Sequence, residues 1–230
     1  MKNELSKMNT LLSQWISEKY LKNAFLINAQ NIFCKGKPFS HIVLHDFFVK
    51  EKINALSSAL KQIKYEEKYS DLFSFLQSAD LKTIADPLIE EFVSFYTSEV
   101  FCNYVQKLCK DHSLVDADLS AFIYREGDYL LPHDDRLEKR KIAYVINLST
   151  HFSKKDGGRL QFFNSKKEQI NEQRKGQRKV VPTKIVKSFI PTYNTLFLFR
   201  VSEKSFHQVE EVMSRKQRRS IGGWFHAKRL

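Results

Sequence analysis

The chain has 230 residues, of which 42% are hydrophobic, and this is enough for one large domain with a substantial core. This composition excludes an intrinsically disordered chain, and the sequence has no apolar run of the roughly 18 to 20 residues that span a bilayer. The net charge of +12 permits an acidic partner such as RNA but does not require one, because a basic surface also favours solubility. We expect a single domain over residues 1–230.

The start of the chain and its cysteines indicate a cytoplasmic protein. Residues 1–20 lack the uninterrupted apolar core of a signal peptide. Cys34, Cys102 and Cys109 are odd in number and lack a C-x-x-C spacing. We therefore expect reduced thiols and neither disulfides nor a cysteine zinc site.

Residues 1–115 are expected to be mainly helical. Apolar residues at spacings of three and four predict a helix over residues 3–22. A short strand in "HIVLHDFF" ends at Asp46, a plausible N-cap for a helix over about 48–63. Asp86 before Pro87 is typical of a helix start, and the pattern that follows predicts one long helix to about residue 112.

From about residue 116 the pattern changes to short apolar or alternating runs separated by turn residues. Such runs are typical of strands: "LSAFIYREGDY", "KIAYVINLS", "KDGGRLQFF", "TKIVKSFIP", "YNTLFLFRV", "SFHQVEEV" and "RRSIGGWFHA". Helices followed by strands at near-regular spacing predict an α+β fold. Its core is a double-stranded β-helix, or cupin-like jelly roll, over 116–230 with supporting N-terminal helices.

One basic stretch, residues 164–182, breaks the strand pattern. Its cations are Lys166, Lys167, Arg174, Lys175, Arg178 and Lys179, against only Glu168 and Glu172. It is either a solvated loop or a basic arm that contacts phosphate or an acidic substrate surface. No aromatic residue interrupts it, so no platform for base stacking is predicted there.

The stretch "YLLPHDDRLEKRKIAYVINL" carries metal-type side chains where a strand is expected. In extended backbone His133 and Asp135 share one face, while Asp134 points to the other. A second histidine, His207, begins a late strand that a jelly roll returns beside the earlier ones. Two histidines and one carboxylate leave three metal positions open, as in non-haem Fe(II) oxygenases. The same donors also hold hydrolytic Zn(II).

A cosubstrate anchor would distinguish these two metal chemistries. If the open positions take 2-oxoglutarate, its far carboxylate needs a cation, and the planar fork of Arg218 matches a carboxylate. Ser220 lies two residues further on the same strand face as a hydroxyl helper. Tyr124 can donate its phenol to the cosubstrate, although an ordinary core tyrosine remains an alternative. A hydrolytic zinc site has no need of such an anchor.

Longer segments resemble the Fe(II)- and 2-oxoglutarate-dependent prolyl hydroxylases, most closely the eukaryotic ribosomal-protein prolyl 3-hydroxylases. The resemblance extends from about residue 40 to 228. It rests on "YEEKYSDLFSFLQSADLK", "LLPHDDRLEKRKIAYVINL", "DGGRLQFF", "IVKSFIPTYNTLFLFRVSEKSFHQVEEV" and "RRSIGGWFHA". The first segment lies outside the generic oxygenase core and is similar to a family-specific segment near the substrate.

The resemblance implies a reaction and a set of site residues. His133, Asp135 and His207 would be the iron ligands. Arg218 would pair with the 2-oxoglutarate side-chain carboxylate, and Tyr124 would lie against the cosubstrate. The implied reaction hydroxylates a prolyl residue of a protein, with a uS12-type ribosomal protein as the expected target. It consumes O2, releases succinate and CO2, and takes ascorbate as a supporting reductant.

The sequence departs from the family pattern at two places. Asn147 stands where the family usually has a second tyrosine that contacts the cosubstrate; an amide can hydrogen-bond a carboxylate but adds no aromatic wall. The eukaryotic relatives carry a further β-domain after the "GWFH" strand, whereas this chain stops at Leu230. The basic stretch 164–182 is therefore a candidate for docking on the substrate, RNA or the ribosome.

Two alternative functions stay open. The same oxygenase chemistry can act on another protein side chain, a free amino acid or a small metabolite, because one scaffold hosts many substrates. A catalytically silent module that binds RNA or ribosomes is a different class of function. The intact set of ligand types argues against it.

Overall fold

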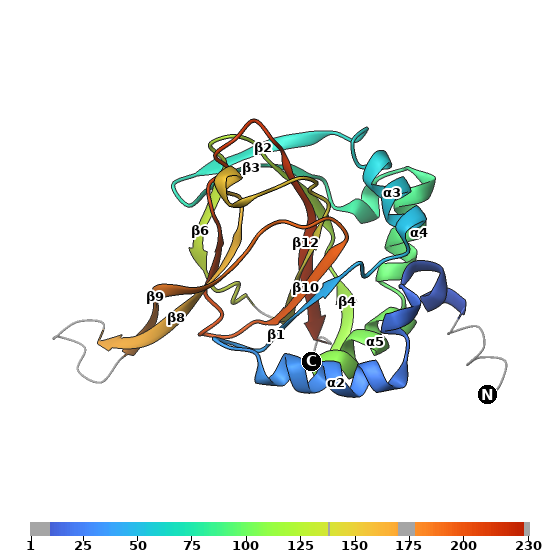
Figure 1. Ribbon diagram of the computed structural model, residues 1–230, viewed down its shortest axis with the longest axis horizontal. Coiled ribbons are helices and arrows are strands. Elements are labelled where there is room, and N and C mark those ends of the chain that lie inside the picture. Colours follow the sequence, from blue (N-terminus) through green and yellow to red (C-terminus); the bar gives the residue numbers. More distant parts are fainter. Residues whose placement is uncertain (1–9, 138, 170–177, 228–230) are drawn as a thin grey trace.

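A strongly curled antiparallel sheet forms the centre of the molecule in the computed structural model, which describes residues 10–137, 139–169 and 178–227 (Figure 1). Its strands are β1 (His41–His45), β2 (Tyr65–Ser70), β3 (Phe73–Ser78), β4 (Leu114–Ala117), β5 (Ser120–Tyr124), β6 (Tyr129–His133), β7 (Arg140–Asn147), β8 (Leu160–Gln169), β9 (Arg178–Phe189), β10 (Thr195–Arg200), β11 (His207–Val209) and β12 (Arg218–Ala227). Their order is β1-β10-β7-β12-β5-β3-β6-β11-β8-β9, with β2 on β3 and β4 on β12. The predicted double-stranded β-helix is confirmed.

The helices cover the outer face of one half of the sheet (Figure 1). They are α2 (Asn23–Lys35), α3 (Lys50–Ala59), α4 (Pro87–Tyr96) and α5 (Glu99–Cys109), with the 3-10 turns η1 (Glu18–Tyr20), η2 (Leu81–Thr83) and η3 (Lys154–Asp156). No helix in the described ranges is both long and apolar enough to cross a membrane. Cys34, Cys102 and Cys109 are free thiols, as expected, and the latter two are buried on α5.

Strand β7 is apolar on both faces because each face packs against a different part of the core. Ile142, Tyr144 and Ile146 pack into the core shared with the helices. Ala143 and Val145, which alternate with them, pack into the interior of the curled sheet. Period-2 alternation therefore separates a layer that packs on the helices from a layer that packs inside the curled sheet.

Two helix boundaries differ from the predictions. Within the described part of 3–22, the helix covers only 10–15, because Ile16 leaves it to form a β-bridge with Phe48. Asp46 is not the N-cap of α3: it has φ +53°, and α3 begins only at Lys50. Tertiary contacts decide both places: Ile16 pairs with Phe48, and the amide of Phe47 donates to the carbonyl of Asn194. Local periodicity does not contain that information.

The helix predicted from Asp86 is two helices. Asp86 does cap the start, since its carboxylate accepts hydrogen bonds from the amides of Leu88 and Ile89. Ser98 then caps a second helix by accepting from the amide of Phe101, so that α4 and α5 turn against each other. A serine inside a long helical pattern is the local signal of this break.

The N-terminal half also supplies strands that the helical prediction does not include. β2 and β3 form a hairpin, and β3 pairs with both β5 and β6. The hairpin thereby joins the two halves of the curled sheet (Figure 1).

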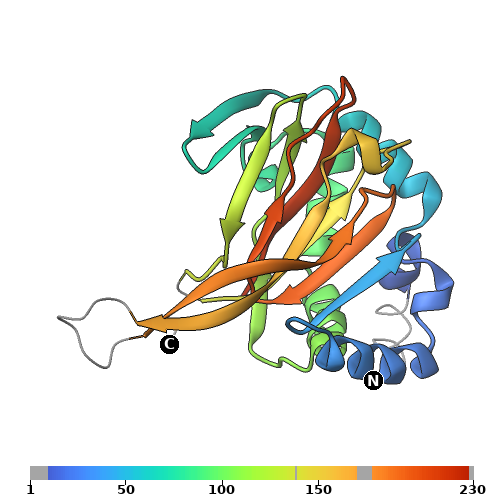
Figure 2. The same cartoon turned by 60° about the vertical axis from the view of Figure 1, so that its left-hand side comes forward.

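The basic stretch 164–182 is largely a two-stranded ribbon. β8 continues to Gln169 and β9 begins at Arg178, and the pair projects away from the barrel (Figure 2). The loop prediction is wrong for these strand residues; 170–177, with Arg174 and Lys175, lie outside the described residues. Strand pairing tolerates lysine where both faces of a ribbon meet solvent. Val180 anchors its base by packing on Phe163 and Phe206.

Candidate metal and cosubstrate site

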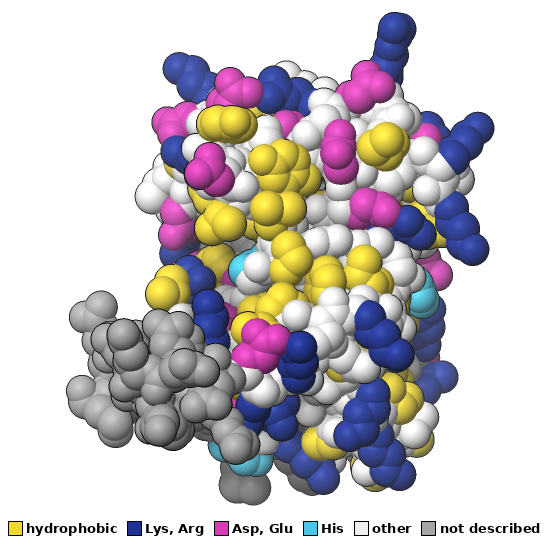
Figure 3. All heavy atoms as spheres, turned by 90° about the vertical axis from the view of Figure 1, so that its left-hand side faces the viewer, with side chains coloured by type: hydrophobic (Ala, Val, Ile, Leu, Met, Phe, Trp, Pro, Cys, Tyr) yellow, Lys and Arg dark blue, Asp and Glu magenta, His cyan; other side chains and the backbone are white. Residues whose placement is uncertain are grey.

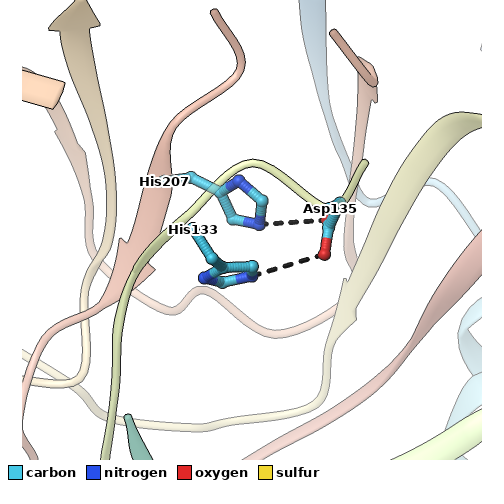
Figure 4. A group of neighbouring side chains, drawn as sticks. All are labelled: His133, Asp135 and His207. Carbon is cyan, nitrogen blue, oxygen red and sulfur yellow. Dashed lines mark ion pairs between the residues drawn. The ribbon is translucent and has the colours of Figure 1, made fainter. Parts of the chain in front are cut away.

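Three metal-type side chains converge in a cavity of about 380 Å³ inside the curled sheet. Nε2 of His133 lies 3.4 Å from Oδ1 of Asp135, and Nε2 of His207 lies 3.2 Å from its Oδ2 (Figure 4). One ligand atom from each residue lies within 4.8 Å of the others. Two imidazoles and one carboxylate thus face a common point.

The three side chains lie on different backbone segments. His207 in β11 pairs directly with His133 at the end of β6, so that neighbouring strands place the two rings together. Asp135 lies beyond the strand and has φ +61°, a left-handed conformation. Strand alternation predicts that His133 and Asp135 share one face. Their proximity instead depends on a turn that folds the carboxylate back.

Main-chain carbonyl groups orient both imidazole rings. Nδ1 of His133 lies 2.8 Å from the carbonyl oxygen of Leu131, and Nδ1 of His207 lies 2.8 Å from that of Ser205. A carbonyl oxygen only accepts, so each Nδ1 carries the proton and donates. Each Nε2 is left with its lone pair toward the common point, as a metal ligand requires.

The triad holds its carboxylate ionised. Burial of Asp135 raises the pKa of its carboxyl group, but the attraction of His207 and His133 outweighs this and holds the pKa well below its usual range. Despite burial, which lowers it, the pKa of His133 is raised by Asp135. The acid is therefore available as a charged ligand at neutral pH.

A buried guanidinium lies on another wall of the same cavity. Arg218 is 1% exposed; its Nε donates to the carbonyl of Gly158 at 2.9 Å and its Nη1 to Oγ of Ser220 at 3.2 Å. Burial lowers its pKa, and it has no carboxylate partner among the described residues. A buried cation without an anion is costly, so this one points to an anionic ligand.

Tyr124 and Asn147 lie beside Arg218 on neighbouring strands. Tyr124 is opposite Arg218 in the β5–β12 register, its ring centre lies 5.1 Å from the guanidinium carbon, and burial raises its pKa to about 12. Asn147 is opposite Ser220 in the β7–β12 register. It is buried, and its Oδ1 has no hydrogen-bond partner in the described structure. Unlike Tyr124, Asn147 is not among the residues that line the cavity.

Two lining residues were not predicted from the sequence. The guanidinium of Arg140 stacks over the ring of Trp224 at 3.3 Å, and Nε1 of Trp224 is buried without an acceptor within the described chain. Both lie in quoted motifs, "RKIAYVINL" and "GWFH". Only the sheet register, which pairs the start of β7 with the end of β12, brings them together.

The cavity opens on a face with an apolar surround. Leu72, Phe73 and Phe75 from the β2–β3 hairpin line it, and Leu72 and Leu131 remain 62% and 40% exposed. Figure 3 shows hydrophobic side chains gathered over the upper and middle part of one face, with Lys and Arg side chains below them and along the upper and right edges. The arrangement suits a ligand with an apolar group that enters the cavity.

Comparison with known proteins finds a family similar to the part of the chain that forms this cavity. Residues 119–226 match the 2OG-Fe(II) oxygenase superfamily. The matched segment includes His133, Asp135, His207 and Arg218. The description of this family names Fe(II) and 2-oxoglutarate, and the donor set of the triad and the unpaired buried Arg218 fit this metal and this cosubstrate.

Relatives of known name extend this result. The Prolyl 3-hydroxylase OGFOD1 of Xenopus laevis is 33% identical over 227 residues, which are 96% of this chain and 42% of that protein. The Prolyl 3,4-dihydroxylase OGFOD1 of Ostreococcus tauri is 34% identical, over 89% of this chain and 41% of the relative. The chain thus spans less than half the length of these relatives.

The fold is also similar to a solved prolyl hydroxylase. A prolyl-4-hydroxylase from Pseudomonas putida superposes with a TM-score of 0.64, covering 87% of this chain and 99% of that one. The two sequences are 14% identical, so this likeness concerns the fold alone.

Proposed function

We propose that this chain hydroxylates a prolyl residue in a protein substrate, using Fe(II), 2-oxoglutarate and O2 and releasing succinate and CO2. One observation carries the proposal: a cavity that combines a two-histidine, one-carboxylate triad with a buried guanidinium that lacks an anion. The first feature suits an open metal site, and the second suits a cosubstrate with a free carboxylate.

We assign roles from this geometry. His133, Asp135 and His207 hold the metal through Nε2, a carboxylate oxygen and Nε2. Arg218, with Ser220 and Tyr124, binds the far carboxylate of 2-oxoglutarate. When bound, the iron and its cosubstrates supply the oxidising power for C–H hydroxylation. The apolar walls exclude water from the reacting groups.

Arg140 and Trp224 are the substrate contacts in this proposal. Nε1 of Trp224 is buried without an acceptor in the described structure, the guanidinium of Arg140 stacks on its ring, and both residues line the cavity. A peptide carbonyl offers such an acceptor, while the neighbouring apolar wall suits a proline ring. The names of the relatives from Xenopus and Ostreococcus favour oxidation at C3 of the ring.

A ribosomal protein of the uS12 type is the target that we propose. The relatives named as prolyl 3-hydroxylases support the reaction, and the positive charge of this chain suits a substrate embedded in RNA. On the β8–β9 ribbon, Lys167, Lys179 and Lys184 are exposed and form no ion pair within the described residues. They are candidates for contact with ribosomal phosphate.

The test is incubation of the purified chain with Fe(II), 2-oxoglutarate and O2, with and without a uS12 peptide that spans its decoding-centre proline. We expect succinate release that depends on all three small molecules, and a gain of one oxygen on that proline by mass spectrometry. The matched control replaces this proline with alanine. Succinate release that the peptide does not stimulate, together with oxygen gained by a small metabolite, would contradict the proposal.

A separate assay tests the RNA contact. Neutralising Lys167, Lys179 and Lys184 should weaken binding to ribosomal RNA and lower its salt dependence, with activity on a short peptide retained. Equal RNA affinity of the wild type and the variant across salt concentrations would contradict it. RNA binding by a chain that never decarboxylates 2-oxoglutarate would favour the silent binding module instead.

A further inference from the structure

A tight turn between η3 and β8 supports Arg218 from behind. Its residues are Asp156, Gly157 and Gly158, the "DGG" of the sequence. The carbonyl of Gly158 is the acceptor for Nε of Arg218 at 2.9 Å. This contact uses the Nε edge of the guanidinium, so the remaining N–H groups of the Nη edge are directed to Ser220 and the cavity.

The two glycines allow the turn to approach the chain before β12. Gly157 and Gly158 have φ +67° and +65°, a region that favours glycine. A β-carbon on Gly157 would lie 2.0 Å from the carbonyl oxygen of Glu211. Main-chain hydrogen bonds from Gly158 to Glu211, at 3.1 Å, and from Met213 to Asp156, at 2.9 Å, join the two segments.

The side chain of Asp156 closes the turn. It is 3% exposed, and its Oδ2 accepts hydrogen bonds from the amide and hydroxyl of Ser153, at 2.8 and 2.6 Å, and from Nζ of Lys216 at 3.0 Å. The bonds from Ser153 and Lys216 hold its pKa well below the usual range. Lys216 and Arg218 are two residues apart, so the turn is fixed to one segment at both of its ends.

We propose that Asp156 is a positioning residue for cosubstrate binding: through Gly158 it fixes the direction of the Arg218 guanidinium, and so sets the affinity for the far carboxylate of 2-oxoglutarate. This inference rests on the proposed role of Arg218. Asp156 itself is not among the residues that line the cavity. Because it does not contact the ligand, it acts only through Arg218, which binds the second carboxylate. Its effect is therefore confined to ligands that carry this second carboxylate.

Calorimetric titration of the Mn(II)-loaded chain tests this without turnover. For Asp156→Asn and Lys216→Met, which break the same contact from opposite sides, we expect about 10-fold weaker binding of 2-oxoglutarate. Binding of 2-oxobutyrate, which lacks the second carboxylate, should be unchanged, as should the Mn(II) affinity. Asp111→Asn is the matched control. This carboxylate is 13% exposed and pairs with Arg200 at 2.9 Å, but it follows α5 outside the cavity.

A double-mutant cycle decides whether Asp156 acts through Arg218. In an Arg218→Lys background, Asp156→Asn should have no further effect on 2-oxoglutarate binding, because the guanidinium that the turn orients is gone. Unchanged 2-oxoglutarate affinity in Asp156→Asn, an equal loss for both oxoacids, or an undiminished effect in the Arg218→Lys background overturns the inference. Failure of the wild type to bind 2-oxoglutarate would instead overturn the proposed function.

Discussion

The His–Asp–His triad and the Arg218 cluster lie in one cavity but are built in different ways. The triad combines two strand ends with a left-handed turn residue, and the side chain of His133 stays 30% exposed. Arg218 is 1% exposed, and its neighbours Tyr124 and Ser220 lie on β5 and β12 in regular register. The partly exposed triad forms the open end of the cavity and suits exchange of metal and substrate. The buried Arg218 cluster forms the closed end and holds a positive charge in place for an anion.

Removing the charged ligand of the triad should have the largest effect. Asp135→Asn takes the anionic donor from the metal, so we expect a loss of metal affinity of about 100-fold or more and no detectable hydroxylation. Mn(II) titration followed by electron paramagnetic resonance measures the affinity. His226→Gln is the control, since His226 forms another His–Asp pair, 2.7 Å from Asp118, outside the cavity lining. Equal Mn(II) affinity of Asp135→Asn and the wild type would contradict the ligand assignment.

Changing Arg218 at the closed end should weaken binding of the cosubstrate and leave the metal affinity unchanged. Arg218→Met removes the buried cation, and we expect about 10- to 100-fold weaker 2-oxoglutarate binding, the range for a charged hydrogen-bonded contact. Anaerobic titration of the Mn(II)-loaded variant measures it. Arg219→Met is a close control, because Arg219 bonds Gln217 outside the cavity lining. If both variants bind 2-oxoglutarate equally, the anchor lies elsewhere.

Changing the Arg140–Trp224 stack should affect the protein substrate alone. Trp224→Phe removes the unpaired N–H and keeps most of the ring, so we expect KM for the peptide to rise about 5- to 10-fold. KM for 2-oxoglutarate should stay the same. Steady-state kinetics with each substrate varied in turn measures both. Arg136→Gln, which breaks a pair with Asp134 outside the cavity lining, should leave both constants unchanged. An increase confined to 2-oxoglutarate would contradict the assignment.

The smallest effect concerns acid stability of the turn behind Arg218. The pKa of Asp156 is depressed by Ser153 and Lys216, so its stabilising contribution is present above the unfolded pKa of about 3.9 and is lost as the pH falls toward the lower folded value. Asp156→Asn should therefore lower Tm at pH 7 and make Tm less sensitive to pH below about 4. Melting curves from pH 2.5 to 7 measure this. Parallel acid curves for the wild type and the variant would contradict it.

Much of the site chemistry could be predicted from single residues. Histidine and aspartate in a strand pattern, a late histidine and an Arg-x-Ser strand name the chemical groups, because these side-chain types are uncommon on strand surfaces. The pairing of His207 with His133 agrees with the expectation that a jelly roll returns the late strand beside the earlier ones.

Other features could not be predicted, because they depend on contacts between distant segments. The left-handed Asp135, the Arg140–Trp224 stack and the ribbon of β8 and β9 arise from pairing that local periodicity does not contain. The division of the long helix at Ser98 had a local signal, but only packing of α4 and α5 on the sheet makes use of it.

The sequence by itself determined the strand periodicity and the side chains available to bind a metal and an anion. The tertiary structure alone decided where these groups point. Asp135 needs a turn beyond its strand, and Arg218 needs the carbonyl of Gly158, which lies sixty residues earlier in the chain. The physical reason is that the direction of a side chain depends on backbone conformation and long-range hydrogen bonds. The chemical group that a side chain carries depends only on the residue type.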